Sequence, residues 1–484
     1  MRFIKILTWL FCAVGLFAFS VVDAMETSDA SRLISDAREI ASDLDDSDDR
    51  WRALVEVAGA EALFVDQKNG TSELVSLGMS AKYDFDRPKV LKYLLELGAL
   101  EELQKLSERF GPMALKLALQ AEAEQEYNKV FLMAADQIKE PFERRFAFET
   151  VGIMAAREGH ILDALEALDE VRQFAIHSST GEVELLCELA KSWEKSDPDQ
   201  FVKTIDKAAI IAKKLPRSTM KDRPRDRASS LIAQTWASLG YEKQTFGAIR
   251  RIKSRKISSW ARLDASLAAA QGGHPQLSEK LTDSVDNKTY EMTGQINKLV
   301  SIQLALDDVD AAFELVPEIS KSCDAQASAI ANIARYMIHK GEFIEAMLII
   351  DRIAVHSEPS VVSEKALILE HLAKLQAETG DFNLSKQTID LIPRMAIENG
   401  NQIYECGVVR GHFVGVQQRN VDTVRDATNK QIAHSAMKRA FGKLAEEMTA
   451  NGSLDELSDC IKDVTNPEVM LEVLLGIVRG QNKG

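Results

Sequence analysis

Hydrophobic residues recur along this chain at the spacing of one helix face, in pairs of runs separated by a short break. The first run of one such pair is spaced three and four residues apart, at Ile330, Ile333, Ala334, Met337 and Ile338. A break follows at Lys340, Gly341 and Glu342. The second run comprises Phe343, Ala346, Ile350 and Ile353. The pattern predicts two helices joined by a tight glycine turn.

The same frame recurs along much of the chain when the turn glycine is taken as its reference point. Around Gly341, small residues stand seven positions before the turn (Ala334) and five after it (Ala346), and large aliphatic residues stand nine and twelve after it. Turn positions that fit the frame are Gly98, Gly159, Gly240, Gly273, Asp307, Gly341, Gly380, Asn420 and Gly452. From Gly240 onward they are 32 to 40 residues apart, which predicts one helical hairpin per interval.

Each position of the frame has its own physical reason. Glycine takes the left-handed backbone conformation that other residues resist, and small residues let the two helices of a hairpin approach closely. Large aliphatic residues fill the space between neighbouring hairpins. Since one hairpin cannot bury both of its faces, hairpins must stack on one another. We therefore expect an all-α fold, an α-solenoid (superhelix) of stacked helical hairpins.

In these positions the chain resembles the tetratricopeptide repeat family, which uses the same small residue, turn glycine, following alanine and apolar residue. It departs from that family at the twelfth position after the turn, which is Ile or Val here, and most of the closing prolines are missing. The resemblance implies a concave groove lined by the first helix of each hairpin. Three side chains six residues before their glycines could contact a ligand there: Gln234, Arg335 and Lys374. The alternative is that they are ordinary solvated side chains of the surface.

Composition agrees with an extended helical array. The chain has 484 residues, of which 45% are hydrophobic, but aromatic residues make up 6% and there are 11 prolines. Lys and Arg total 59 against 74 Asp and Glu, which gives a net charge of -15 at pH 7. A chain this acidic is not expected to bind nucleic acid through general phosphate contacts.

The first 24 residues have the features of an export signal. Arg2 and Lys5 give a positive start, an apolar run extends from Ile6 to Val22, and Ala24 provides a small residue for cleavage. The alternative is an uncleaved anchor, although the run of about 17 residues is shorter than the roughly 20 that a membrane span needs. Cleavage after Ala24 predicts a periplasmic or secreted protein with no membrane span in its mature chain.

Shifts in composition divide the rest of the chain. Residues 25–50 are acidic and precede the repeat frame, and we expect a frayed or capping segment there. Helical repeats are expected over 51–215 and 227–464, separated at 216–226 by a charged loop with two prolines. Residues 465–484 are expected to form a C-terminal helix and tail that cap the stack.

One stretch of the chain carries the opposite charge to the rest. Between positions 213 and 256 there are thirteen basic residues and three acidic ones. If they face one side of the molecule, they form an anion-binding patch for an acidic protein, a lipid headgroup or an acidic glycan. The alternative is a solvated loop whose cations pair with the chain's own acids. The candidates are Arg217, Lys221, Arg223, Arg225, Arg227, Arg250, Arg251, Lys253, Arg255 and Lys256.

Sequence motifs for catalysis or cofactor binding are missing. There is no phosphate-binding glycine loop, no His-Glu-x-x-His and no Cys-x-x-Cys, and the histidines and cysteines show no metal-binding spacing. We therefore expect no cofactor, no metal and inert thiols. The leading hypothesis is a non-enzymatic exported scaffold or adaptor that binds a protein or peptide partner, such as an acidic one. The runner-up is a carbohydrate-active enzyme, built as an α/α toroid or as a peptidoglycan-associated helical domain.

Overall fold

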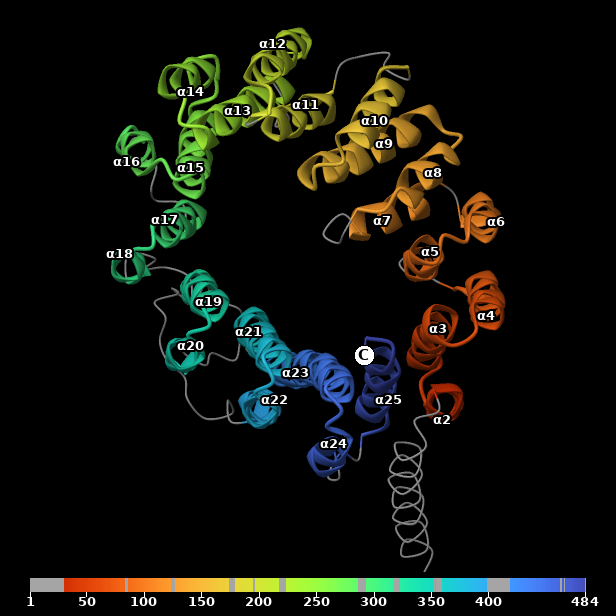
Figure 1. The fold of residues 1–484 in the computed structure, drawn as a ribbon. Helices are drawn as coiled ribbons and strands as arrows, with labels where there is room; N and C mark the ends of the chain where they lie inside the picture. Colours follow the sequence, from red (N-terminus) through yellow and green to blue (C-terminus); the bar gives the residue numbers. More distant parts are fainter. Residues whose placement is uncertain are drawn as a thin grey trace, which may run out of the picture. The chain divides into compact units, whose positions relative to one another are not determined.

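The protein is helical throughout the part of the chain that its structure, a computed structural model, describes (Figure 1). The described residues are 30–82, 86–110, 112–122, 127–173, 179–194, 196–216, 223–285, 293–316, 323–351, 353, 359–397, 418–461, 464 and 466–483. No strand occurs in these ranges, so the predicted all-α solenoid class is confirmed. The chain divides into two compact units, of which unit 1 comprises 1–77 and 320–484 and unit 2 comprises 78–319.

Unit 2 is a row of consecutive helical hairpins. The first helices α9, α11, α13, α15 and α17 pack on one another in this order. Figure 1 shows the second helices α14, α16 and α18 on one side of the row. The helices are α5 (Arg87–Glu96), α6 (Leu100–Phe110), α7 (Pro112–Glu122), α8 (Val130–Asp136), α9 (Pro141–Arg157), α10 (Ile161–Gln173), α11 (Thr180–Trp193), α12 (Pro198–Lys214), α13 (Pro224–Ser238), α14 (Glu242–Ile249), α15 (Arg255–Gln271), α16 (Pro275–Asp283), α17 (Thr293–Ala305) and α18 (Val309–Leu315).

Unit 1 combines hairpins from both ends of the chain. Here α19, α21, α23 and α25 form the row of packed helices, and α2 and α3 continue it beyond α25. The helices are α2 (Ala30–Ser42), α3 (Ser47–Phe64), most of α4 (Gln67–Ser80), α19 (Cys323–His339), α20 (Phe343–Asp351), α21 (Pro359–Glu378), α22 (Phe382–Ile397), α23 (Gln418–Ala450), α24 (Leu454–Ile461) and α25 (Pro467–Gln481).

The last helix, α25, is enclosed within unit 1. It packs against α23 on one side and against α2 and α3 on the other. Its buried residues face in every direction: Val469, Met470, Leu471, Val473, Leu474, Leu475, Gly476, Ile477, Val478 and Gly480. The helix that we expected to cap the stack is therefore an internal member of the row, because α2 buries its own apolar face against it.

The acidic segment before the repeats also packs in the structure. Residues 30–42 form α2, whose buried residues Leu33, Ile34 and Ala37 belong to the core of unit 1. In the acidic run that follows, Asp46 is the N-cap of α3, and its carboxylate accepts hydrogen bonds from the backbone amides of Asp48 (2.7 Å) and Asp49 (3.1 Å). The described part of 25–50 is thus a helix and a cap, not a frayed segment.

The predicted turns are confirmed by the backbone. Every described residue with a positive φ stands at a turn of the predicted frame: Gly98, Gly159, Gly240, Gly273, Asp307, Gly341, Gly380 and Gly452. At Gly341 the amide of Glu342 donates to the carbonyl of Met337 and the amide of Gly341 donates to Ile338, which closes the end of α19. The prediction at Asn420 is wrong, because this residue lies inside α23.

Small residues of the frame lie where the two helices of a hairpin meet. Ser385, five after its turn glycine, donates a hydrogen bond of 2.8 Å to the carbonyl of Ala373, seven before it. Around Gly273 the direction is reversed, and the hydroxyl of Ser266, seven before the turn, donates to the carbonyl of Ser278, five after it, at 2.8 Å. The aliphatic positions nine and twelve after the turn are buried, as at Leu168, Val171, Ile350, Ile353, Ile389 and Ile392. Close approach within hairpins is therefore confirmed, and the aliphatic positions after the turn belong to the core.

Replacing a turn glycine tests the conformational role of the frame. We expect Gly159→Ala to lower the free energy of unfolding by about 1 kcal/mol, because its φ of 82° disfavours any Cβ although the space around it is open. The matched control is Gly247→Ala within α14, which also has open space but no positive φ, and which should stabilise unit 2 by about 0.5–1 kcal/mol. Urea unfolding that shifts both variants in the same direction would contradict this assignment.

The contact between α23 and α25 gives a second test. A Cβ added at Gly476 would lie 2.1 Å from the carbonyl oxygen of Gly442, so the backbones touch directly. We expect Gly476→Ala to destabilise unit 1 by roughly 1–3 kcal/mol and to raise amide hydrogen exchange in α2 as well as in α25, since α2 packs on α25. Unchanged exchange in α2 would show that α25 does not hold the N-terminal helices.

Candidate anion-binding site

The ten predicted basic residues fall in three parts of unit 2. Two of them lie outside the described residues: Arg217 and Lys221. Three stand at the start of α13: Arg223, Arg225 and Arg227. Five extend from the end of α14 to the first turn of α15, and we call these the basic stretch: Arg250, Arg251, Lys253, Arg255 and Lys256.

Two arginines before and within α13 serve the fold. Arg225 is half-buried, and its guanidinium donates hydrogen bonds to the backbone carbonyls of Leu215 (3.1 Å) and Lys213, at the end of α12. Arg223 is also half-buried and lies 3.9 Å from the carboxylate of Asp226. Arg225 therefore braces the connection between α12 and α13, and Arg223 pairs within the start of α13.

Buried Asp226 joins the start of α13 to the basic stretch. Its carboxylate accepts hydrogen bonds from the backbone amides of Lys253 (3.2 Å) and Ser254 (3.1 Å), in the loop between α14 and α15. Ser254 in turn caps α15 by accepting from the amide of Ile257. These bonds fix the loop that carries the basic stretch.

All five side chains of the basic stretch are exposed. The first turn of α15 holds Arg255 and Lys256 and no acidic residue. Cations at a helix N-terminus are repelled by the positive end of the helix dipole, where acidic side chains or bound anions are favoured. The stretch thus presents a concentrated positive potential on a chain whose net charge is -15.

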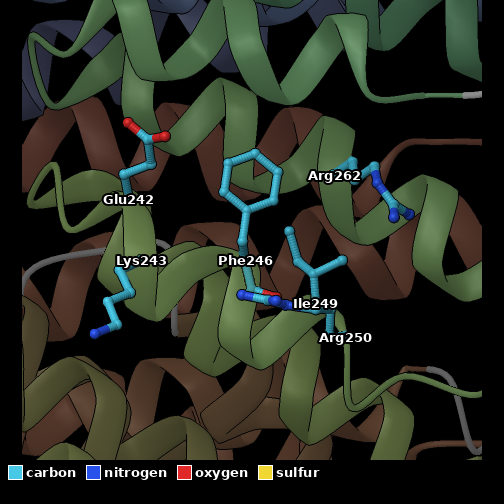
Figure 2. Close-up of a pocket in the computed structure, with 6 residues that line it drawn as sticks. All are labelled: Glu242, Lys243, Phe246, Ile249, Arg250 and Arg262. Atoms are coloured by element: carbon cyan, nitrogen blue, oxygen red, sulfur yellow. The ribbon is translucent and has the colours of Figure 1, made fainter.

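A hollow of about 750 Å³ lies beside the basic stretch, between α14 and α15. We call it the α14 hollow. Its walls are formed by Glu242, Lys243, Phe246, Ile249, Arg250 and Arg262. Figure 2 shows Phe246 between Glu242 and Arg262 in its view. The carboxylate of Glu242 is bonded to Lys280 of α16 at 2.7 Å, so its charge is neutralised within the chain.

Of the residues that line this hollow, only Arg250 is among the ten basic residues predicted from the sequence. Lys243, Phe246 and Ile249 come from α14, whereas Arg262 comes from α15, eleven residues before the turn at Gly273. A hollow between successive hairpins depends on packing that spacing within one hairpin does not show. The signal that could have found it is the residue type at the position eleven before each turn.

The three predicted groove residues have polar partners inside the chain. Arg335 lies 2.6 Å from the carboxylate of Glu364 in the next first helix, and Lys374 lies 2.7 Å from Glu370. The side-chain amide of Gln234 donates to the hydroxyl of Ser230 at 3.2 Å. Contact of these three residues with a ligand stays a prediction.

Neither a metal site nor a reactive thiol at Cys187 is seen among the described residues. No group of three or more His, Cys, Asp and Glu side chains there is placed to hold a metal ion. Burial raises the pKa of the Cys187 thiol to about 12, which keeps it protonated. Among the described helices, none combines the length and the apolar character that crossing a bilayer requires.

Comparisons with known proteins give only distant structural likenesses. No protein-family model and no curated protein sequence matches the chain. The crystal structure of Ton1535 from Thermococcus onnurineus NA1 is similar, with 13% identity over 86% of this chain and 97% of that chain and a TM-score of 0.24. A circular tandem repeat protein with novel repeat topology and enhanced subunit contact surfaces has 14% identity over 98% of both chains and a TM-score of 0.20. Likenesses this distant carry no argument about function.

The ion pairs of Glu370 with Arg439 and with the predicted groove residue Lys374 can be tested by pH. Burial alone would raise the pKa of Glu370, but hydrogen bonds from Arg439 and Lys374 hold it below the usual value. The resulting stabilisation is fully present above the ordinary pKa of about 4.3 and is lost as the pH falls through the lowered value.

We expect Arg439→Met to cost about 2 kcal/mol at pH 7, since Arg439 is partly exposed, and much less at pH 3. Urea unfolding at the two pH values measures the difference. Lys386→Met is a control, because Lys386 pairs with the exposed Asp390 on α22. Equal losses for Arg439→Met at both pH values would contradict the ion-pair account.

Proposed function

We propose that this protein is a non-enzymatic, exported scaffold that binds an acidic protein or peptide partner through its helical-repeat surface. The observation that carries the proposal is the basic stretch, which five exposed cations form beside the α14 hollow on a chain of net charge -15. The helical-repeat fold supports it, because stacked hairpins present a long side-chain surface to a partner.

Charge favours an acidic partner for this surface. The net negative charge of the rest of the chain repels acidic molecules at long range, whereas the basic stretch attracts them locally. Such a contrast raises the rate of encounter and orients the partner more than it adds affinity. Weakening of the complex by salt is therefore part of the proposal.

Export rests on the leader at residues 1–24, which has a positive start, an apolar run and Ala24 at its end. The periplasm or the extracellular space is accordingly where we place the partner. The proposal of a scaffold also carries the prediction that the purified protein leaves peptidoglycan and other glycans uncut.

Neutralising the basic stretch tests the proposal. The test variant changes Arg250, Arg251, Lys253 and Lys256 to Gln and leaves Arg255 in place. Its matched control removes the same charge from exposed lysines elsewhere in unit 2: Lys89, Lys105, Lys203 and Lys207. Each protein, without residues 1–24, serves as bait for the exported fraction of the producing cells, followed by affinity measurement with the purified partner.

We expect the wild-type and control baits to capture an acidic partner and the test variant to bind it at least about tenfold more weakly, with the difference shrinking in high salt. If all three baits capture the same partner with the same affinity, the basic stretch has no part in binding. Release of soluble sugar from peptidoglycan by the wild-type protein would instead establish the carbohydrate-active alternative.

A further inference from the structure

The α14 hollow exists where one repeat departs from the others in a single residue type. The position eleven before the turn is apolar in most copies of the frame, and all of these residues except Ile330 are buried: Phe148, Ile296, Ile330, Leu369 and Phe441. In the copy that ends at Gly273 the same position is Arg262. Arg262 lines the hollow against α14, so an apolar side chain at this position would pack toward the preceding hairpin.

Two other copies also lack an aliphatic or aromatic residue at this position, and their surroundings differ from those of Arg262. Ser229 is small and buried. Arg87, in the first copy, has its guanidinium 5.4 Å from the centre of the Phe110 ring, which gives the cation an aromatic partner.

Among the described residues, the guanidinium of Arg262 has few hydrogen-bond acceptors and no acidic partner. Its Nη1 donates to the carbonyl (3.1 Å) and the hydroxyl of Ser258, one turn earlier in α15. Its Nε is buried and has no hydrogen-bond partner among the described residues, and no described carboxylate lies within ion-pair distance. Burial lowers the pKa of Arg262, which agrees with a charge that is desolvated and has no acidic partner among the described residues.

Elsewhere in the fold, basic residues on first helices pair with acids of an adjacent first helix. In unit 2, Lys298 of α17 lies 3.0 Å from Asp264 of α15, and in unit 1 Arg439 of α23 lies 2.5 Å from Glu370 of α21. Against this pattern, Arg262 is a half-buried cation that faces a hollow. A buried donor without an acceptor costs stability unless a ligand supplies one.

The rest of the hollow limits what such a ligand can be. Phe246 and Ile249 form an apolar wall, and Lys243 and Arg250 add two cations. Because Glu242 is held by Lys280, the hollow keeps a positive balance. Phosphate or a sugar acid would meet the cations but would gain nothing from the apolar wall, whereas a peptide can place a carboxylate and a large apolar side chain together.

We propose that the α14 hollow is a subsite for an acidic peptide segment, in which a carboxylate bonds to Arg262 and a neighbouring apolar side chain packs on Phe246. The inference rests on the proposed function in that the segment belongs to the protein partner. Arg262 thus binds the ligand at a position where an apolar residue would stabilise the fold. The basic stretch beside it attracts acidic segments toward the subsite.

The test uses a fluorescent probe peptide of sequence Asp-Glu-Leu-Phe-Glu-Asp and the full mature chain. The key variant is Arg262→Leu, which restores the residue type found in other copies and should fold as well as the wild type or better. We expect it to bind the probe at least tenfold more weakly in fluorescence anisotropy, while its urea midpoint is unchanged or raised. Phe246→Ala should lose binding too, and a probe with Ser in place of Leu and Phe should bind weakly to the wild type.

Several outcomes would overturn the subsite. They are equal probe binding by wild type and Arg262→Leu, a lower urea midpoint for Arg262→Leu that marks Arg262 as structural, absence of probe binding at millimolar concentration, or equal binding of the Leu-Phe and Ser probes. Displacement of the probe by inorganic phosphate or by anionic vesicles from wild type and Phe246→Ala alike would assign the site to a phosphate group or to a membrane.

The two proposals fail in different ways. If Arg262→Leu captures the same partner with wild-type affinity but the probe does not bind, the scaffold stands and the subsite falls. If the wild-type chain binds the probe through Arg262 but captures no partner, the subsite stands and the scaffold function falls.

Discussion

The close approach of the two helices within each hairpin is the constraint on which the rest of the structure depends. It requires a left-handed residue at the turn and small residues at the crossing, so that Ser385 can bond directly to the backbone at Ala373. Once a hairpin has this shape, its apolar positions nine and twelve after the turn are buried in the stack. Packing of first helices then brings charged side chains on adjacent helices within ion-pair distance.

The hairpins and their turns could be predicted from the sequence because each is determined locally. A residue with positive φ is recognisable as glycine, or at Asp307 by its position between regular copies. The same reasoning failed at Asn420, where the interval suggested a turn and the chain continues as the long helix α23. Asparagine tolerates a helix as well as a turn, so residue type alone did not separate the two.

Contacts between distant parts of the chain could not be read in this way. The enclosure of α25 by α2 joins residues more than 400 positions apart, and no periodicity signals it. The candidate site likewise has a part that the sequence predicts and a part that depends on packing. Exposed charge near residue 250 was visible as composition, whereas the α14 hollow depends on how α15 meets the preceding hairpin. Arg262 could not be singled out from the pattern of its own hairpin, because its surroundings depend on the preceding hairpin.

The place of α25 also has a consequence for how the protein comes to be folded. Helices α2 and α3 are synthesised more than 400 residues before α25, which packs on both of them. Unit 2, which is continuous in sequence, can form as soon as its own residues are made, but unit 1 must wait for α25. For that interval the first helices expose Leu33 and Ile34, so a nascent chain has an unshielded apolar surface that a chaperone can hold.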